Sequence, residues 1–346
     1  MHYEYGKINP CMRKSSHPIR VAVVGTGTIG MRHLNILRKD PEVDVVAIPS
    51  RSERVNQLIK KGIPAVAKLA EVMPCHAVII ATDTNQHVKG ICEAIDLGIH
   101  VILVEKPLAS SLSSLKPIAN ARDTNDYKIY IGYCLRFDIG LLTFREKLPL
   151  IGQVYNVQIE ARSYLPNWRP HRNYRQSYSA RQGEGGVLLD LIHEIDYAIW
   201  LFGMTQTVFG KLGYSGQLDI ETEDHVSIFW TAPSGTHISI ALDYLSKIPV
   251  RRMTAYGVNG VLKWDALACS VEMQVVNIPI DLIKVGGMRD DMYYAQMKAF
   301  LKAVAGENSK QLVSFHEGEQ SLSVCDAIRR SSETGSEEEV LHWKVP

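Results

Sequence analysis

The stretch IRVAVVGTGTIGMRHLNILRKD, residues 19–40, decides the fold of the N-terminal half of the chain. Its apolar start predicts a strand over Val21–Val24, and apolar positions at helical spacing further on predict a helix. Between them Gly25, Gly27 and Gly30 form the pattern GxGxxG. In that pattern the first glycine permits a tight turn, the second lets a pyrophosphate approach the backbone, and the third packs helix against strand. The order of strand, turn and helix favours a dinucleotide site over a glycine-rich turn without a nucleotide.

Strands and helices continue to alternate after this unit. Apolar runs predict strands at 43–48, 76–82 and 100–105, and the intervening segments 52–62 and 85–99 predict helices. This alternation predicts a parallel sheet with helices on both faces. Ligands of such sheets bind beyond the carboxyl ends of the strands, so Thr82, Glu105 and Lys106 are expected on the same rim as the glycine turn.

The end of the second predicted strand bears on the choice of cofactor. Proteins that bind NAD generally place a carboxylate about twenty residues past the glycines, where it holds the ribose 2′-hydroxyl. Here Pro49, Ser50 and Arg51 occupy that stretch. A hydroxyl and a guanidinium suit a 2′-phosphate, so the pattern favours NADP, with NAD as the alternative. A solvated helix-start residue is the other interpretation of Arg51.

Three segments, GTGTIG, ATDTNQH and GIHVILVEKPLA, carry a resemblance to a known family. Together they resemble the nucleotide-binding half of the Gfo/Idh/MocA family of sugar and cyclitol oxidoreductases. The resemblance implies that Lys106 reaches both the nicotinamide ribose and the reacting hydroxyl of the substrate, and that Thr82 and His87 lie near the cofactor. Asp83 departs from the family, which usually has proline there. The expected cofactor residues are Gly25, Thr26, Gly27, Thr28, Ile29, Gly30, Ser50, Arg51, Thr82, His87, Glu105 and Lys106.

The chemistry expected of Lys106 follows from its position as well as from the resemblance. A lysine at a sheet rim, partly shielded from water and beside other charges, can have its pKa lowered towards neutrality. Its ammonium can stabilise the alkoxide that develops while a hydride leaves a carbinol carbon. Pro107 restricts the backbone of Lys106 to extended geometry. Without the resemblance, an ordinary surface charge after a strand remains an equal alternative.

The second half of the chain has long alternating runs at 154–165, 225–232, 237–245 and 253–264, with a tight hairpin turn expected at Asn259–Gly260. They predict an α+β domain with a large, mainly antiparallel open sheet. The predicted fold is therefore α/β, with an N-terminal extension (1–18), a Rossmann dinucleotide-binding domain (19–135) and an α+β domain (136–346). Later helices, around 290–306 and 318–335, are expected to pack on this sheet or on the first domain. The resemblance implies a homodimer or homotetramer through the sheet.

The segment 185–203 predicts a single amphipathic helix between glycines. Leu188, Leu191, Ile195, Ile199 and Phe202 share one face, and Asp190, His193, Glu194 and Tyr197 share the opposite one. A solvated polar face is the simplest interpretation. The family, however, carries an acid and a histidine here, which implies that His193 is the catalytic base and that Asp190 sets its tautomer and charge. The spacing is three residues instead of the usual four, so Glu194 is the alternative acid.

Residues 161–183 form an arginine-rich segment without acidic side chains. It contains aromatic rings and five arginines, at positions 162, 169, 172, 175 and 181. Such a cluster indicates an anionic small ligand held by guanidinium groups, with Tyr164, Trp168 or Tyr174 stacking on a sugar or base. The segment is similar to the family branch found with surface-polysaccharide and acidic-sugar biosynthesis, which implies a carboxylated or nucleotide-activated sugar. A subunit contact or a lid is the alternative. The expected substrate residues are Lys106, Tyr133, Arg136, Tyr164, Arg169, Tyr174 and His193.

Composition restricts the remaining classes of function. The 346 residues carry a formal net charge of +1, which gives no global case for nucleic acid or an acidic membrane surface. The six cysteines include no CxxC pair, so neither a metal site nor a redox dithiol is expected. The first twenty residues lack the apolar run of a signal peptide, and a cytoplasmic location is expected. The predicted function is an NAD(P)-dependent oxidoreductase acting on a secondary hydroxyl of a sugar. A non-catalytic dinucleotide-binding regulator and a glycosidase with a transiently oxidising cofactor are the alternatives.

Overall fold

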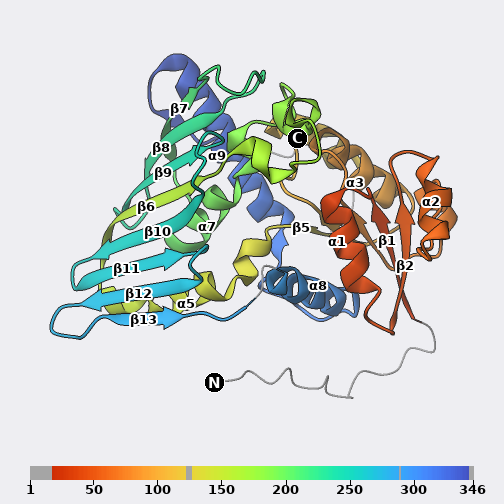
Figure 1. Ribbon diagram of the computed structural model, residues 1–346, viewed down its shortest axis with the longest axis horizontal. Coiled ribbons are helices and arrows are strands. Elements are labelled where there is room, and N and C mark those ends of the chain that lie inside the picture. Colours follow the sequence, from red (N-terminus) through yellow and green to blue (C-terminus); the bar gives the residue numbers. More distant parts are fainter. Residues whose placement is uncertain (1–17, 122–126, 288–289, 343–346) are drawn as a thin grey trace.

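The computed structural model describes residues 18–121, 127–287 and 290–342, which form two β-sheets with helices between and around them (Figure 1). The expected N-terminal extension lies outside the described residues apart from Pro18. No helix in the described part of the chain combines the length and the apolar composition needed to cross a bilayer.

The first sheet is the parallel sheet predicted from the sequence. Its strands run in the order β14-β5-β4-β3-β1-β2. The five parallel strands are β1 (Ile19–Val24), β2 (Val43–Ile48), β3 (Ala77–Ile80), β4 (Val101–Val104) and β5 (Lys128–Ile131). The edge strand β14 (Val313–Ser314) pairs antiparallel with β5, so a segment from the end of the chain completes the sheet.

Both faces of this sheet are covered. In β1, Val21 and Val23 pack in the core cluster that contains Leu34 and Phe300, whereas Ala22 packs in the cluster on the other side. Successive side chains of a strand point to opposite faces, so a strand buried on both sides is apolar throughout. The helices of this half are α1 (Thr28–Leu37), α2 (Arg54–Lys60), α3 (His87–Asp96), α4 (Lys116–Ala121) and α8 (Asp291–Val304).

The second sheet is large, open and mainly antiparallel, as predicted. Its order is β13-β12-β11-β10-β6-β9-β8-β7-β15, and only the pair β6–β9 is parallel among the described pairings. The strands are β6 (Val154–Arg162), β7 (Thr207–Gly213), β8 (His225–Thr231), β9 (His237–Asp243), β10 (Val250–Gly257), β11 (Gly260–Asp265), β12 (Ser270–Val275), β13 (Asp281–Lys284) and β15 (Glu338–Glu339). The turn between β10 and β11 is Val258–Asn259, one residue earlier than expected, because Gly260 already pairs with Gly257.

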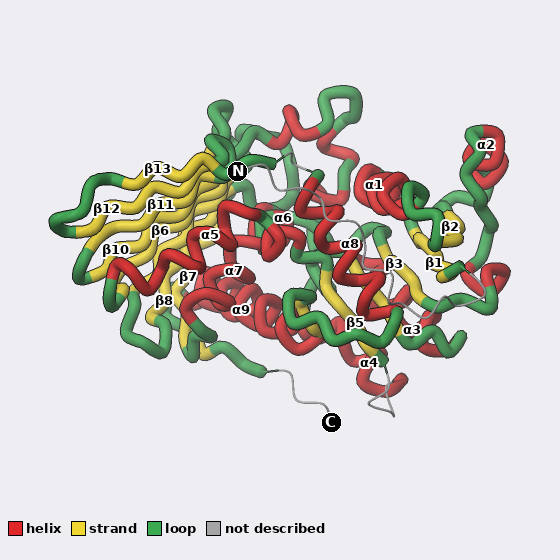
Figure 2. Tube along the Cα trace, turned by 90° about the horizontal axis from the view of Figure 1, so that it is seen from below, coloured by secondary structure: helices red, strands yellow, loops and turns green. Residues whose placement is uncertain are grey.

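One face of the large sheet is covered by α5 (Ile139–Lys147), α7 (His193–Phe202) and α9 (Phe315–Thr334) (Figure 2). Strand β8 shows the consequence, because Val226, Ile228 and Trp230 are buried while Phe229 on the opposite face is exposed. Helix α9 begins beside β5 of the first sheet and packs along β7 of the second, so it ties the two sheets together.

The prediction of a single helix over 185–203 is wrong. The segment forms α6 (Val187–Asp190) and α7, with a break at Leu191. In a continuous helix the amide of Glu194 would bond to the carbonyl of Asp190, but it bonds to Leu191 instead. The carbonyl of Asp190 accepts a hydrogen bond from Lys106, at 2.8 Å. The interpretation of the polar face as solvated is wrong as well, since its four side chains are buried: Asp190, His193, Glu194 and Tyr197.

Candidate active site

The glycine turn between β1 and α1 has the shape of a phosphate cradle. Gly25 has φ +94°, and a Cβ there would lie 2.3 Å from the carbonyl oxygen of Ala81. A Cβ on Gly30 would lie 1.9 Å from the carbonyl oxygen of Gly25, whereas a Cβ on Gly27 would meet nothing within 4 Å. No side chain caps the N-terminus of α1, so its first amides are free to face an anion. Close packing at Gly25 and Gly30 with open space at Gly27 fits a bound pyrophosphate.

Two hydroxyls and a histidine extend this rim. Thr26 and Thr82 each have a buried Oγ1 without a hydrogen-bond partner among the described residues, which suits contact with a bound ligand. His87 is buried, with Nδ1 2.8 Å from the carbonyl oxygen of Pro107 and Nε2 3.2 Å from that of Thr82. Burial lowers the pKa of His87. A neutral imidazole has one N–H, and the shorter of the two contacts, to the carbonyl oxygen of Pro107, joins the start of α3 to the loop after β4.

Glu105 contacts a residue that sequence reasoning missed. Its Oε1 lies 2.6 Å from Nε2 of His33, which is fully buried on α1, and its Oε2 accepts a hydrogen bond of 3.3 Å from the amide of Lys106. This pair joins the end of β4 to α1. Nothing in the spacing of the sequence distinguishes His33 from other residues on the inner face of that helix.

Lys106 and Asp190 lie together although 84 positions separate them. Besides its hydrogen bond to the Asp190 carbonyl, the ammonium lies 3.8 Å from Oδ1 of the carboxylate. Oδ2 accepts a hydrogen bond of 2.6 Å from the hydroxyl of Tyr244, while Oδ1 has no hydrogen-bond partner in the described part of the chain. Burial and the Asp190 carboxylate raise the pKa values of Tyr178 and Tyr244 well above the usual range. Tyr244 and Tyr178 were not identified from the sequence.

His193 stands at the start of α7 with 8% of its surface exposed. Burial, followed by the positive charges of Lys106 and Arg251, lowers its pKa well below the ordinary value, so the imidazole is neutral near pH 7. Its ring meets the ring of Tyr133 edge-on, with centroids 5.6 Å apart.

The relay expected between Asp190 and His193 is not formed, because no hydrogen bond joins the two side chains in the described residues and Nδ1 of His193 has no partner there. The alternative acid, Glu194, pairs with Arg251 at 2.8 Å. Asp190 instead balances the charge of Lys106.

Arg136 is placed differently from the substrate contact expected of it. It lies in the 3-10 helix Cys134–Phe137 with 3% exposure. Its Nε and Nη2 donate to Asp196 at 3.0 and 2.7 Å, and Nη1 donates to Glu317 at 2.5 Å. All three guanidinium nitrogens are thus engaged in ion pairs, a buried one with Asp196 of α7 and a partly buried one with Glu317 of α9, which leaves none of them unpaired for a substrate.

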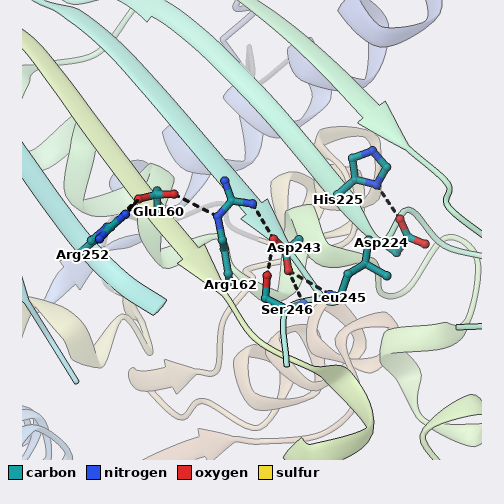
Figure 3. A network of polar contacts seen from close by, with 8 residues as sticks. All are labelled: Glu160, Arg162, Asp224, His225, Asp243, Leu245, Ser246 and Arg252. Carbon is teal, nitrogen blue, oxygen red and sulfur yellow. Dashed lines mark hydrogen bonds and ion pairs between the residues drawn. The ribbon is translucent and has the colours of Figure 1, made fainter. Parts of the chain in front are cut away.

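Three of the five arginines in the segment 161–183 bind acids from other parts of the chain. Arg162 pairs with Asp243 at 2.7 Å and Glu160 at 3.1 Å, in a network that continues to Arg252 across β10, β6 and β9 (Figure 3). Asp243 also accepts hydrogen bonds from the backbone amides of Leu245 and Ser246, which fixes the turn around Tyr244 (Figure 3).

The other two pairs lie further along the segment. Arg175 pairs with Asp219 at 3.1 Å, and Arg181 pairs with Asp83 at 2.8 Å. The composition of the segment therefore predicts more unpaired positive charge than the structure has, because acidic side chains from elsewhere in the chain neutralise three of its arginines.

A hollow of about 590 Å³ lies between the segment and the rim of the first sheet. Its lining includes Trp168, Tyr174 and Tyr178 and four arginines, at positions 51, 169, 172 and 181. Trp168 packs edge-on against Tyr244, with centroids 5.3 Å apart, so this hollow adjoins the Lys106 centre. Tyr164 is not among the lining residues.

No group of three or more His, Cys, Asp or Glu side chains in the described residues is placed to hold a metal ion. The described cysteines, at positions 75, 92, 134, 269 and 325, are free thiols.

Two family models match the chain. The model described as an oxidoreductase family with an NAD-binding Rossmann fold matches residues 19–133, and the GFO/IDH/MocA C-terminal domain matches residues 150–263. The chain belongs to the Gfo/Idh/MocA family of oxidoreductases. The family membership expected from GTGTIG and GIHVILVEKPLA is thereby confirmed.

Relatives of known activity and solved structures agree with this membership. The chain is 29% identical to inositol 2-dehydrogenase/D-chiro-inositol 3-dehydrogenase of Lacticaseibacillus casei over 75% of this chain and 79% of that protein. It is 27% identical to scyllo-inositol 2-dehydrogenase (NAD(+)) of Bacillus subtilis over 54% and 55% of the two chains.

Among solved structures, levoglucosan dehydrogenase with NADH superposes with a TM-score of 0.82 at 18% identity, covering 94% of this chain and 100% of that one. The WlbA dehydrogenase of Bordetella pertussis, in complex with NADH and UDP-GlcNAcA, gives 0.77 at 19% identity, with coverage of 94% and 99%. At these identities the likeness shows the fold.

Proposed function

We propose that the protein is an NAD(P)-dependent dehydrogenase that transfers a hydride between the nicotinamide and a secondary hydroxyl of a sugar or sugar derivative. The observation that carries the proposal is the meeting of Lys106 with Asp190, beside a neutral His193, on the rim that also holds the glycine turn. The two relatives named above are inositol dehydrogenases, which supports a polyhydroxylated substrate.

The residues of this centre divide the chemistry between them. The nicotinamide, when bound, supplies the carbon that accepts the hydride. The Lys106 ammonium stabilises negative charge on the substrate oxygen, and Asp190 keeps that ammonium in place. His193, neutral because of its buried and cationic surroundings, takes the hydroxyl proton as general base. The dinucleotide would be held by the glycine turn Gly25 to Gly30 with the free amides of α1, and by the unpaired hydroxyls of Thr26 and Thr82.

The substrate class we favour is an acidic or nucleotide-activated sugar. Arg169 and Tyr174 line the hollow next to the Lys106 centre, and together they offer a cation and an aromatic ring to an anionic sugar derivative. The likeness to the fold of a dehydrogenase bound to UDP-GlcNAcA is compatible with this class.

The cofactor we favour is NADP. Ser50 and Arg51 follow β2 and are exposed, and Arg51 lines the same hollow. A titration with each dinucleotide tests this choice. We expect the unaltered protein to bind NADP more tightly than NAD. Arg51→Met is expected to weaken the binding of NADP and to leave the binding of NAD unchanged. Equal or tighter binding of NAD by the unaltered protein would remove the role given to Arg51.

The activity itself can be tested by screening sugars, sugar nucleotides and cyclitols with NAD and NADP separately, following the absorbance of the reduced nicotinamide. With a confirmed substrate, Lys106→Met and His193→Asn are expected to lower kcat at least a hundredfold, an effect typical of lost acid-base or charge stabilisation. Lys302→Met, on the exposed side of α8, is the matched control for loss of a lysine. Product without net reduction of the cofactor would favour the transient-oxidant alternative, and binding without any turnover would favour a regulator.

We also infer a homodimer or homotetramer through the uncovered face of the large sheet. Phe209 and Phe229 pair in register on β7 and β8 and are 41% and 43% exposed on that face. Exposed aromatic side chains of this kind are enriched in subunit contacts. The cytoplasmic location stays a prediction.

A further inference from the structure

The hollow under the arginine-rich segment is built from both domains. Arg51 comes from the loop after β2 and Asp83 from the loop after β3, whereas Arg169 and Arg172 belong to the segment that follows β6. A ligand in this space would therefore touch the nucleotide-binding domain and the C-terminal domain at once.

Two contacts join the end of the arginine-rich segment to the loop after β3. Arg181 pairs with Asp83 at 2.8 Å, and the side-chain amide of Asn85 donates to Glu184 at 2.7 Å. Arg181 also contacts Glu184, at 3.0 Å. These contacts neutralise Arg181 and Asp83, so neither adds charge for a ligand.

Three guanidinium groups in the hollow remain uncompensated. Arg51, Arg169 and Arg172 have no ion-pair or side-chain hydrogen-bond partner among the described residues, although the other arginines of the segment each bind a carboxylate. Several like charges facing a concave space repel one another unless an anion lies between them. The unpaired arginines of the segment thus line the space, whereas the paired Arg162 and Arg175 are not among its lining residues.

The number and kind of these groups indicate a phosphate. A single carboxylate is satisfied by one guanidinium fork, whereas a phosphate dianion offers three acceptor oxygens and more charge. Tyr174 and Trp168 beside the arginines add ring faces for a base or sugar.

We propose that Arg51, Arg169 and Arg172 form one phosphate-binding subsite shared by the two domains, which takes the ribose phosphate of NADP or a phosphate of a nucleotide-activated substrate. The inference deepens the proposed function, on which it rests for the identity of the two phosphate sources. It adds two residues of the C-terminal domain to the recognition of phosphate.

Binding measurements on the full chain test the subsite without any turnover. The probes are NADP, NAD and UDP, titrated by calorimetry against the unaltered protein, Arg169→Met, Arg172→Met and the double variant. Arg175→Met is the matched control, because Arg175 belongs to the same segment, pairs with Asp219 and does not line the hollow. Arg169 and Arg172 hold no partner, so the variants should keep the thermal stability of the unaltered protein.

Two results would support the subsite and assign its source. A ten- to hundredfold rise in Kd for NADP with unchanged Kd for NAD, the scale of lost hydrogen bonds to a charged group, assigns the phosphate to the cofactor. A similar rise for UDP with both dinucleotides unaffected assigns it to the substrate. Unchanged Kd for all three probes in the double variant would overturn the proposal.

The outcome is separable from that of the proposed function. Binding of the three probes and hydride transfer are measured independently, so each can fail without the other. Arginine-dependent phosphate binding in a protein that transfers no hydride would leave the subsite standing and remove the dehydrogenase. Hydride transfer in a protein whose binding of the three probes does not depend on the arginines would support the dehydrogenase and remove the subsite.

Discussion

At the residue scale, the charge of Lys106 organises the candidate active site. The ammonium donates a hydrogen bond to the carbonyl oxygen of Asp190 at the end of α6, and it lies 3.8 Å from the carboxylate of the same residue. It also helps to keep His193 neutral, because a nearby cation disfavours a second positive charge. Lys106 therefore adds to the effect of burial on the protonation of His193.

The pKa of His193 should respond to that charge. In Lys106→Met we expect the pKa of His193 to rise, since one of the two cations that lower it is gone. The measurement is an NMR titration of the imidazole C–H signals, with the His193 signal assigned by its loss in His193→Asn. A pKa that stays where it was would mean that burial alone sets it.

The same shift has a consequence for stability. Because the folded protein resists protonating His193, the contribution of this residue to the free energy of unfolding is fully present above the ordinary imidazole pKa of about 6.5 and is lost as the pH falls below it. Urea denaturation at several pH values should show a weaker acid dependence for His193→Asn than for the unaltered protein.

Tyr244 is expected to position Asp190. Tyr244→Phe removes the donor of the 2.6 Å hydrogen bond to Oδ2 and leaves a buried carboxylate oxygen without a partner. We expect a loss of about 1–3 kcal/mol in the free energy of unfolding and a lower kcat with little change in KM. Unchanged kcat beside lowered stability would show that the contact is structural alone.

At the element scale, the break between α6 and α7 decides which groups reach the site. The amphipathic pattern of 185–203 is compatible with one long helix, yet α7 restarts at His193 and the carbonyl of Asp190 turns to Lys106. Gly186, with φ +97°, begins the unit, and a Cβ there would lie 2.1 Å from Glu223.

Gly186→Ala should therefore be costly. A substitution with both an unfavourable φ and a steric conflict is expected to lower the free energy of unfolding by about 2 kcal/mol or more. Gly183→Ala is the matched control, because Gly183 has φ +76° and open space around its would-be Cβ. Thermal denaturation of both variants checks the difference, and equal losses would mean that φ alone matters.

Arg136 joins three elements and should matter for stability. Arg136→Met leaves the buried carboxyl group of Asp196 without its partner, for which we expect a loss of about 3–5 kcal/mol in the free energy of unfolding. The exposed pair Lys302–Glu307 gives the comparison, since Lys302→Met should cost less than about 1 kcal/mol. Urea denaturation measures both.

At the scale of the whole molecule, the large sheet separates a covered face from an open one (Figure 2). If the open face is the subunit contact, Phe229→Glu should lower the molar mass measured by light scattering to that of a monomer, because a charge would have to be buried. Ile59→Glu places the same charge on α2, where Ile59 is 52% exposed, and should leave the molar mass unchanged. A monomeric unaltered protein would contradict the contact.

The sequence by itself determined the local units of the fold. The parallel strands, the glycine turn, the alternating strands of the large sheet and the family membership follow from periodicity and short motifs, which act over a few neighbouring residues. Lys106 could be singled out because EKP ends an apolar strand and also resembles the family motif; the strand alone left a surface charge as an equal alternative.

Only the tertiary structure decided which side chains meet. The Asp190 carboxylate faces Lys106 and Tyr244 instead of His193, His33 finds Glu105, and Arg136 is committed to Asp196 and Glu317. Each of these pairs joins positions that are 54 to 181 residues apart, which helical or strand spacing does not connect. Burial then fixes their protonation, because the pKa of a group depends on the charges and the solvent that folding leaves around it.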